Sequence, residues 1–178
     1  VEIVEAHRRG IPVFERTQAW GTLMRDYKNA ICIAGTHGKT TTTSMSTHIL
    51  MAADRDPTVM IGGTLPLLKA GHRVGNGDTI ILEACEYYNS FLSFSPTVAV
   101  ILNIEEDHLD FLKDLEDIKR SFRRFAELVP ADRGCVVANI DDKNTMDALA
   151  GIERRVMTFG LSPEADVHAE NITSNGDQ

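Results

Sequence analysis

The stretch Ala30-Ile31-Cys32-Ile33-Ala34-Gly35-Thr36-His37-Gly38-Lys39-Thr40-Thr41 decides the fold of this chain. Its first five residues, 30–34, form an apolar run that is too short for a helix and is followed by turn residues, so we expect a buried strand. A helix is predicted from about residue 39 to residue 53. The glycine-rich turn between the two elements is where a phosphate-binding loop joins a strand to a helix.

The residues of this turn are suited to holding the phosphates of ATP. Gly35 and Gly38 allow a sharp turn that brings backbone N–H groups toward an anion, and the helix N-terminus adds its positive end. Lys39 is predicted to reach the β- and γ-phosphates, and Thr41 to bind the next phosphate inward. The hydroxyl of Thr40 is predicted to join the ligand shell of a Mg²⁺ ion.

The loop departs from the general pattern G-x-x-x-x-G-K-[ST], because Ile33 occupies the first glycine position. The alternative is a glycine turn that caps a helix and binds nothing. A lysine and a threonine at these offsets serve no structural need, which favours the phosphate loop. The run Thr40–Thr43 favours it too, because β-branched residues are mediocre helix formers and their hydroxyls suit an anion site.

The rest of the chain alternates strand-like and helix-like segments. Further strands are expected at residues 58–61, 79–82, 97–102, 135–138 and 155–159, and helices at 114–129 and 141–150. Two of the strands, 79–82 and 97–102, lack polar alternation, as expected when both faces of a sheet are covered. The order predicts an α/β fold with a doubly wound, mostly parallel sheet.

Residues 1–26 read as helix, strand and helix, with the strand at Gly10–Phe14. They are expected to be the last unit of a preceding domain, which divides the chain into residues 1–27 and residues 28–178. The chain starts at Val1 and ends in a polar tail, so we expect it to be a fragment of a longer protein.

Composition limits the classes of function. The net charge is −8, which argues against a general nucleic-acid surface. No apolar run approaches the roughly 20 residues of a membrane-spanning helix, and the first residues do not read as a signal peptide. Cys32, Cys85 and Cys135 are far apart and odd in number, which favours reduced thiols in a cytosolic protein over a disulfide or a metal set.

Polar residues close several of the predicted strands, where ligands gather in doubly wound sheets. Glu83 stands where a carboxylate that holds Mg²⁺ belongs, although a solvated strand-end glutamate is the alternative. After Asn103 comes Asp107-His108-Leu109-Asp110, which suits a metal or substrate contact or, equally, a capping aspartate beside an exposed histidine. The amide of Asn139 can pair with an adenine edge or cap a helix turn.

Together these pieces resemble the Mur ligase family, which builds the peptide stem of bacterial peptidoglycan. The resemblance is carried by four stretches in the family's order: Gly35–Thr42, Glu83–Glu86 with Ser90-Phe91-Leu92, Asn103–Asp110 and Asn139–Asp142. By this resemblance, Lys39, Glu83 and His108 are catalytic residues. The residues implied to bind ATP are Gly35, Thr36, His37, Gly38, Lys39, Thr40, Thr41 and Asn139. Thr40 and Glu83 are implied to hold one Mg²⁺, and His108 to help hold a second.

The resemblance also implies a reaction. Family members that add L-alanine carry a histidine at the position of His37, so the implied reaction joins L-alanine to the carboxylate of UDP-N-acetylmuramate through an acyl phosphate. A murein-peptide recycling ligase also carries that histidine, but residues 87–110 look closer to the L-alanine-adding members. Cys85 stands where many relatives have aspartate. Residues 1–27 would end the UDP-binding N-terminal domain, residues 28–178 would form an incomplete ATP-binding domain, and the C-terminal domain would be absent.

Two readings outside the ligases compete with this one. The first is a small-molecule kinase or NTPase with a shortened loop, and the second is a nucleotide-responsive binding module. The ligase reading implies a cytoplasmic enzyme with small-molecule substrates, and it implies that the isolated fragment is inactive.

Overall fold

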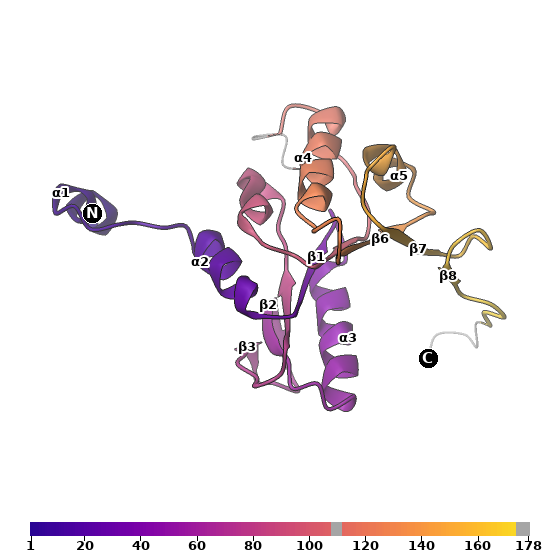
Figure 1. Cartoon of the computed structure of the whole chain (residues 1–178), viewed down its shortest axis with the longest axis horizontal. Coiled ribbons are helices and arrows are strands. Elements are labelled where there is room, and N and C mark those ends of the chain that lie inside the picture. The colour runs from indigo at the N-terminus through magenta and orange to yellow at the C-terminus, as the bar shows by residue number, and fades with distance from the viewer. Residues whose placement is uncertain (108–111, 174–178) are drawn as a thin grey trace.

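The computed structural model describes residues 1–107 and 112–173 (Figure 1). Its helices are α1 (Glu2–Arg8), α2 (Arg16–Leu23), η1 (Met24–Asp26), α3 (Lys39–Ala52), η2 (Tyr87–Ser93), α4 (Leu115–Glu127) and α5 (Lys143–Leu149). Its strands are β1 (Asn29–Ala34), β2 (Thr58–Leu65), β3 (Ala70–Arg73), β4 (Thr79–Glu83), β5 (Val98–Ile101), β6 (Cys135–Asn139), β7 (Val156–Gly160) and β8 (Val167–His168). None of the described helices is long and apolar enough to cross a bilayer.

The strands form one sheet in the order β3-β2-β4-β1-β5-β6-β7-β8. β1 lies between β4 and β5 and runs parallel to both. Only the β2–β3 pair is antiparallel among these strands. The predicted α/β fold with a mostly parallel sheet is therefore confirmed.

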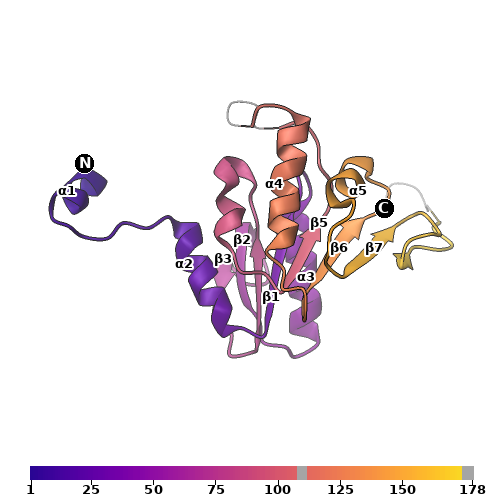
Figure 2. The same ribbon diagram turned by 45° about the horizontal axis from the view of Figure 1, so that its top comes forward.

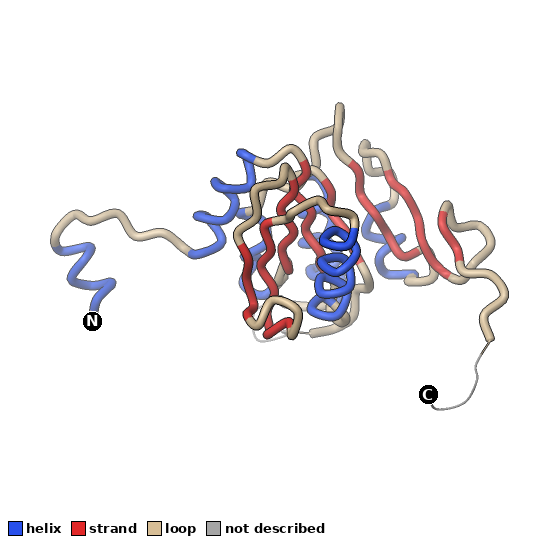
Figure 3. Tube along the Cα trace, turned by 90° about the horizontal axis from the view of Figure 1, so that it is seen from below, coloured by secondary structure: helices blue, strands red, loops and turns tan. Residues whose placement is uncertain are grey.

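Helices cover both faces of the sheet. α4, α5 and η2 lie on one face in Figure 2, and α3 lies against the other face in Figure 3. Alternate residues of β1 point into the two layers, with Cys32 in the larger core and Ile33 in the smaller one. Residues buried on both sides explain why these strands read as continuous apolar runs.

Helix α4 forms because its apolar residues recur on one side. Ile118, Phe122 and Phe125 are buried, and the side chain of Asp114 caps the first turn by accepting a hydrogen bond from the Asp117 N–H at 2.8 Å. This agrees with the helix predicted for residues 114–129.

The sequence predictions were wrong at one element and incomplete at several others. The strand expected at Gly10–Phe14 does not form, and Phe14 is 72% exposed. The described part of the chain offers these residues no neighbouring strand, so their backbone groups join no ladder. Strands β3 and β8 and the segment η2 were not predicted, and β2 continues through Gly62 and Gly63 rather than ending before them.

The N-terminal helices differ in how they meet the sheet domain. α1 buries no residue and lies at the end of an extended arm in Figures 1 and 2. α2 packs on the domain instead, since Trp20 contacts the larger core and a Cβ at Gly21 would lie 1.9 Å from the carbonyl oxygen of Ser93. The division of the chain at residue 27 stays a prediction.

Candidate phosphate-binding site

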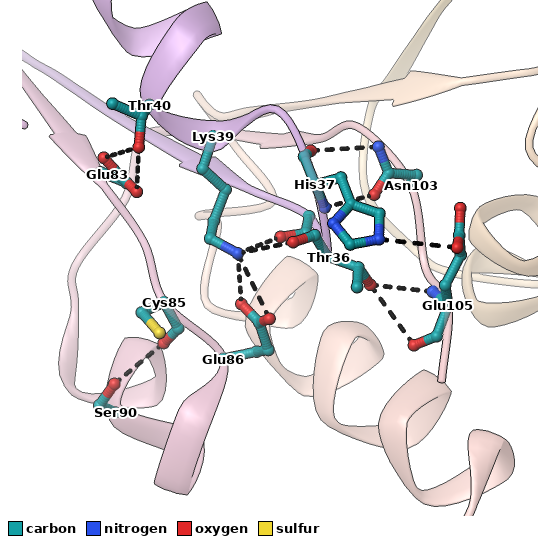
Figure 4. Close-up of polar contacts among 11 residues, drawn as sticks. Thr36, His37, Lys39, Thr40, Glu83, Cys85, Glu86, Ser90, Asn103 and Glu105 are labelled. Atoms are coloured by element: carbon teal, nitrogen blue, oxygen red, sulfur yellow. Dashed lines mark hydrogen bonds and ion pairs between the residues drawn. The ribbon is translucent and has the colours of Figure 1, made fainter. Parts of the chain in front are cut away.

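The loop between β1 and α3 lies at the carboxyl edge of the sheet, where the ends of neighbouring strands bring polar side chains to it. Glu83 ends β4 on one side of the loop, and Asn103 follows β5 on the other (Figure 4). The structure thus brings together residues that are more than 60 positions apart in the sequence, as expected for ligand sites of parallel sheets.

Glycine is required at two positions of the loop. Gly35 has a φ of +148°, and a Cβ added there would lie 3.0 Å from the Leu102 Cβ and 3.3 Å from the Asn103 nitrogen. Gly38 has a φ of +82° and is the N-cap residue of α3, with no side-chain cap. The N–H groups of the first helical turn have no acceptor inside the helix, so they are available to bind an anion at this end of α3.

Asn103 fixes the backbone of the loop from the neighbouring strand end. Its Oδ1 accepts a hydrogen bond from the His37 N–H at 2.8 Å, and its Nδ2 donates to the His37 carbonyl at 3.1 Å. The Thr36 hydroxyl accepts from the Glu105 N–H at 2.9 Å. These hydrogen bonds fix the conformation of the loop through contacts within the protein.

Lys39 is folded toward its own loop. Its Nζ donates to the carbonyl of Gly35 at 2.6 Å and to that of Thr36 at 3.1 Å. It also lies 3.1 Å from a carboxylate oxygen of Glu86, whose side chain is only 2% exposed. The ammonium group therefore sits under the loop, beside a buried counter-charge (Figure 4).

The hydroxyl of Thr40 meets the carboxylate of Glu83. Thr40 Oγ1 donates toward both carboxylate oxygens, at 2.9 and 3.0 Å, and the Gly62 N–H donates to the same carboxylate at 2.7 Å. A Cβ at Gly62 would lie 2.9 Å from Glu83, so this close approach needs glycine. Two residues predicted to share a metal site are therefore adjacent.

The Thr40 and Glu83 oxygens suit Mg²⁺, which prefers hard oxygen ligands and usually takes one or two carboxylates together with waters and phosphate oxygens. In the described ranges no group of three or more His, Cys, Asp or Glu side chains is arranged to hold a metal ion. This is compatible with a Mg²⁺ site, because such a site usually contains only one or two protein ligands. His108, predicted to help hold a second ion, lies outside the described residues.

The other predicted site residues lie close to the loop but with less distinct roles. His37 is exposed, with Nε2 3.7 Å from a carboxylate oxygen of Glu105. Thr41 is exposed on the first turn of α3. Asn139 ends β6, donates to the Leu102 carbonyl at 3.1 Å and accepts from the Asp141 N–H at 3.1 Å. Its side chain thus ties two strand ends together, and its role toward adenine stays a prediction.

Sequence reasoning missed the parts of this site that have no local signature. The sequence predicts no separate role for Glu86, which lies in the stretch Glu83–Glu86, or for Gly62, which follows the strand expected at residues 58–61. A buried carboxylate close to the lysine of a phosphate loop is visible only once β4 and α3 are placed side by side. The pairing of β1 with β4 is the signal that could have found it.

The three cysteines are free thiols. Cys32 is fully buried, and burial raises its pKa well above the ordinary value. Cys85 lies between Glu83 and Glu86, and its pKa is also raised, chiefly by burial and in part by the charge of Glu86. Neither thiol is thus activated as a nucleophile, because a reactive cysteine has a lowered pKa.

Fold and loop together define an α/β protein with a loop of the phosphate-binding type. The sequence pattern of the Mur ligase middle domain matches residues 33–178. The chain belongs to the Mur ligase family.

Individual relatives sharpen this assignment. The chain is 47% identical over 173 residues to the UDP-N-acetylmuramate–L-alanine ligase of Caldicellulosiruptor saccharolyticus, which covers 97% of the chain. It spans only 38% of the length of that relative.

Two solved structures are similar to the chain. One is the UDP-N-acetylmuramate:L-alanyl-γ-D-glutamyl-meso-diaminopimelate ligase from Neisseria meningitides, with a TM-score of 0.79 and 27% identity, covering 88% of this chain and 53% of that one. The other is a UDP-N-acetylmuramate–alanine ligase from Thermotoga maritima, with a TM-score of 0.74 and 30% identity, covering 89% and 35%.

Proposed function

We propose that the protein carrying this chain is an ATP-dependent ligase that joins L-alanine to the carboxylate of UDP-N-acetylmuramate in peptidoglycan synthesis. One observation carries the nucleotide part of the proposal. An uncapped helix N-terminus, a lysine and a Thr40–Glu83 pair converge on the same edge of the sheet. The choice of L-alanine rests on the named relatives and on His37.

The reaction begins with transfer of the γ-phosphoryl group of ATP to the muramoyl carboxylate, which forms an acyl phosphate and releases ADP. The amine of L-alanine then attacks the acyl carbon, phosphate leaves, and the nitrogen loses a proton to give the amide. Catalysis of phosphoryl transfer is mostly positioning and neutralisation of charge. The backbone N–H groups of residues 38–41 and the ammonium of Lys39 supply these contributions.

A Mg²⁺ ion, when bound, neutralises charge on the phosphate oxygens. The residues that would hold it are Thr40 and Glu83, both of which present oxygen atoms at this point. Gly62 orients the carboxylate through its N–H. We also propose that Asn139 contacts adenine, that His108 supports a second ion, and that the enzyme acts in the cytoplasm on small molecules.

We further propose that residues 1–27 end a UDP-binding domain and that residues 28–178 form part of the ATP-binding domain.

A second candidate function is that of a murein-peptide recycling ligase, and one observation favours it. The likeness to the Neisseria structure is as good as the likeness to the Thermotoga structure, and the former ligates a tripeptide rather than one amino acid.

The test is ADP release by the full-length protein with UDP-N-acetylmuramate, ATP and a panel of amines. We expect release that depends on L-alanine and none with the tripeptide. A tripeptide-dependent rate would favour the recycling reaction. Release that ignores the amine would indicate a kinase or NTPase. The isolated chain is expected to release no ADP in an L-alanine-dependent manner.

A further inference from the structure

The phosphate loop and the segment after β4 are joined by two polar pairs that lie side by side. Thr40 pairs with Glu83, and its neighbour Lys39 pairs with Glu86. Consecutive residues at the start of α3 are thus matched to two carboxylates three positions apart. The first pair has a role in the proposed Mg²⁺ site. The second has no role in the reaction described above.

The Lys39–Glu86 pair is far more buried than an ordinary ion pair. The side chain of Lys39 is 14% exposed and that of Glu86 is 2% exposed. Surface ion pairs contribute little, but a buried charge that loses its partner is strongly unfavourable. If Lys39 left Glu86 completely to reach a phosphate, the buried carboxylate would lose the ammonium group that now lies 3.1 Å from it.

The ammonium group can serve Glu86 and a phosphate together. It has three N–H donors, and two of its present acceptors are the neutral carbonyls of Gly35 and Thr36. Exchanging a neutral carbonyl for a phosphate oxygen costs less than exchanging the buried carboxylate. Retaining Glu86 also limits the directions in which the flexible lysine can extend.

Packing and a hydrogen bond hold the backbone segment that follows Glu86. Just after it, the ring of Phe91 stacks on that of Phe125 with centroids 4.6 Å apart, and the Phe91 N–H donates to the Cys85 carbonyl at 3.2 Å. Tyr88 and Asn89 both have left-handed backbone conformations, with φ of 53° and 55°. Such strain persists only where surrounding structure imposes it.

We propose that Glu86 is a positioning residue that holds the Lys39 ammonium where it meets the β-phosphate of a bound nucleotide. The carboxylate acts through Lys39 and does not touch the nucleotide. This inference rests on the proposed nucleotide binding at the loop but not on the identity of the amino acid that is ligated.

The test compares two nucleotides that differ in the phosphate that Lys39 reaches. ADP and AMP, each with Mg²⁺, are titrated into the full-length protein and its Glu86→Gln variant, which keeps the shape of the side chain and removes the charge. We expect ADP affinity to fall about tenfold, as for the loss of a charge-assisted hydrogen bond, while AMP affinity is unchanged. The matched control is Asp56→Asn, which removes a carboxylate paired with Arg73 away from the loop and should leave both affinities unchanged.

A double variant shows whether Glu86 acts through the lysine. In a Lys39→Met background, Glu86→Gln should have no further effect on ADP affinity, because the group that it positions is gone. Glu86→Asp, which keeps the charge but draws it back by one carbon, provides a second test. It should also lower ADP affinity and leave AMP affinity unchanged.

Four results would overturn the proposal: tighter ADP binding in Glu86→Gln, equal losses for ADP and AMP, the same loss in the Lys39→Met background, or a parent protein that binds ADP no better than AMP. Failure of the ligase proposal looks different. In that case the preference for ADP and its dependence on Glu86 remain, while ADP release is independent of L-alanine.

Discussion

The Thr40 hydroxyl lies 2.9 and 3.0 Å from the two carboxylate oxygens of Glu83. The contact follows from the register of the sheet, in which Ile33 of β1 is paired with Glu83 of β4. The next residue continues this pairing, since the Ala84 N–H donates to the Ile33 carbonyl at 2.8 Å. The end of β4 is thereby fixed beside the first turn of α3, which holds the two residues proposed as Mg²⁺ ligands next to each other.

Removing either oxygen ligand should remove the benefit of Mg²⁺ for nucleotide binding. In Glu83→Gln and Thr40→Val, we expect the Mg²⁺-dependent gain in ADP affinity of the full-length protein to fall by about tenfold or more. The reason is that the few oxygen ligands of a Mg²⁺ site act together. ADP titrations with Mg²⁺ and with EDTA measure this gain. Ser44→Ala, which removes a hydroxyl one turn further along α3, should keep it. An unchanged gain in Glu83→Gln would contradict the metal role.

Much of the fold could be predicted from local sequence signals. The strand before the loop, the helix that Asp114 caps and the alternation of strands and helices all depend on apolar patterning and caps, which short windows contain. The positions of Lys39, Thr40 and Glu83 at the loop could be predicted for a related reason. Each stands next to an element boundary, and boundaries at the carboxyl edge of a parallel sheet carry ligands.

What could not be predicted depends on partners that are distant in sequence. Gly10–Phe14 has the composition of a strand, but a strand also needs a neighbour with which to pair. β3 and β8 carry weak patterns and exist because β2 and β7 offer them an edge. The roles of Glu86 and Asn103 are likewise set by contacts across the sheet, 47 and 66 residues from their partners in the loop.

The conformation of Gly35 predicts a large cost for any side chain. Gly35→Ala combines a left-handed φ of +148° with a Cβ only 3.0 Å from that of Leu102, so the loop must shift. We expect a loss of about 2–3 kcal/mol in the free energy of unfolding, from urea titration, together with weaker ADP binding. Gly151→Ala is the matched control, because Gly151 has a φ of +67° with nothing within 4 Å. It should cost about 1 kcal/mol through backbone strain alone. Equal costs would show that the crowding at Leu102 is relieved without strain.

The two aspartate caps should differ in their contribution to stability. Asp142 Oδ1 accepts from the Thr145 N–H at 2.8 Å, and it also accepts from the Ile104 N–H at 3.1 Å. Asp114 caps α4 by accepting a hydrogen bond from the Asp117 N–H. Among the described contacts, this is the only hydrogen bond from a backbone N–H to the Asp114 side chain. Asp114→Ala should cost about 1 kcal/mol, and Asp142→Ala about 2 kcal/mol, because the second also leaves the buried backbone after β5 without its acceptor. Thermal unfolding of both variants shows which one loses more stability, and a larger loss for Asp114→Ala would refute the prediction.

Asp56 gives the domain an acid-sensitive connection between the end of α3 and the β3 hairpin. Its pKa is lowered from the ordinary value, first by a hydrogen bond from the Asn76 N–H at 2.8 Å and then by its ion pair with Arg73. A carboxylate whose folded-state pKa is depressed stabilises the fold above its unfolded pKa, near 3.9 for aspartate, and this contribution is lost as pH falls toward the lower folded value. Asp56→Asn should therefore be less stable than the parent at pH 7, and the difference should shrink below about pH 4. Urea unfolding midpoints of the parent and the variant at pH 7 and pH 3 test this. The control is Asp132→Asn, which should show no such trend, because Asp132 is exposed and lies 4.0 Å from Arg133. A difference that stays constant between the two pH values would place the effect of the substitution in packing rather than in the charge of Asp56.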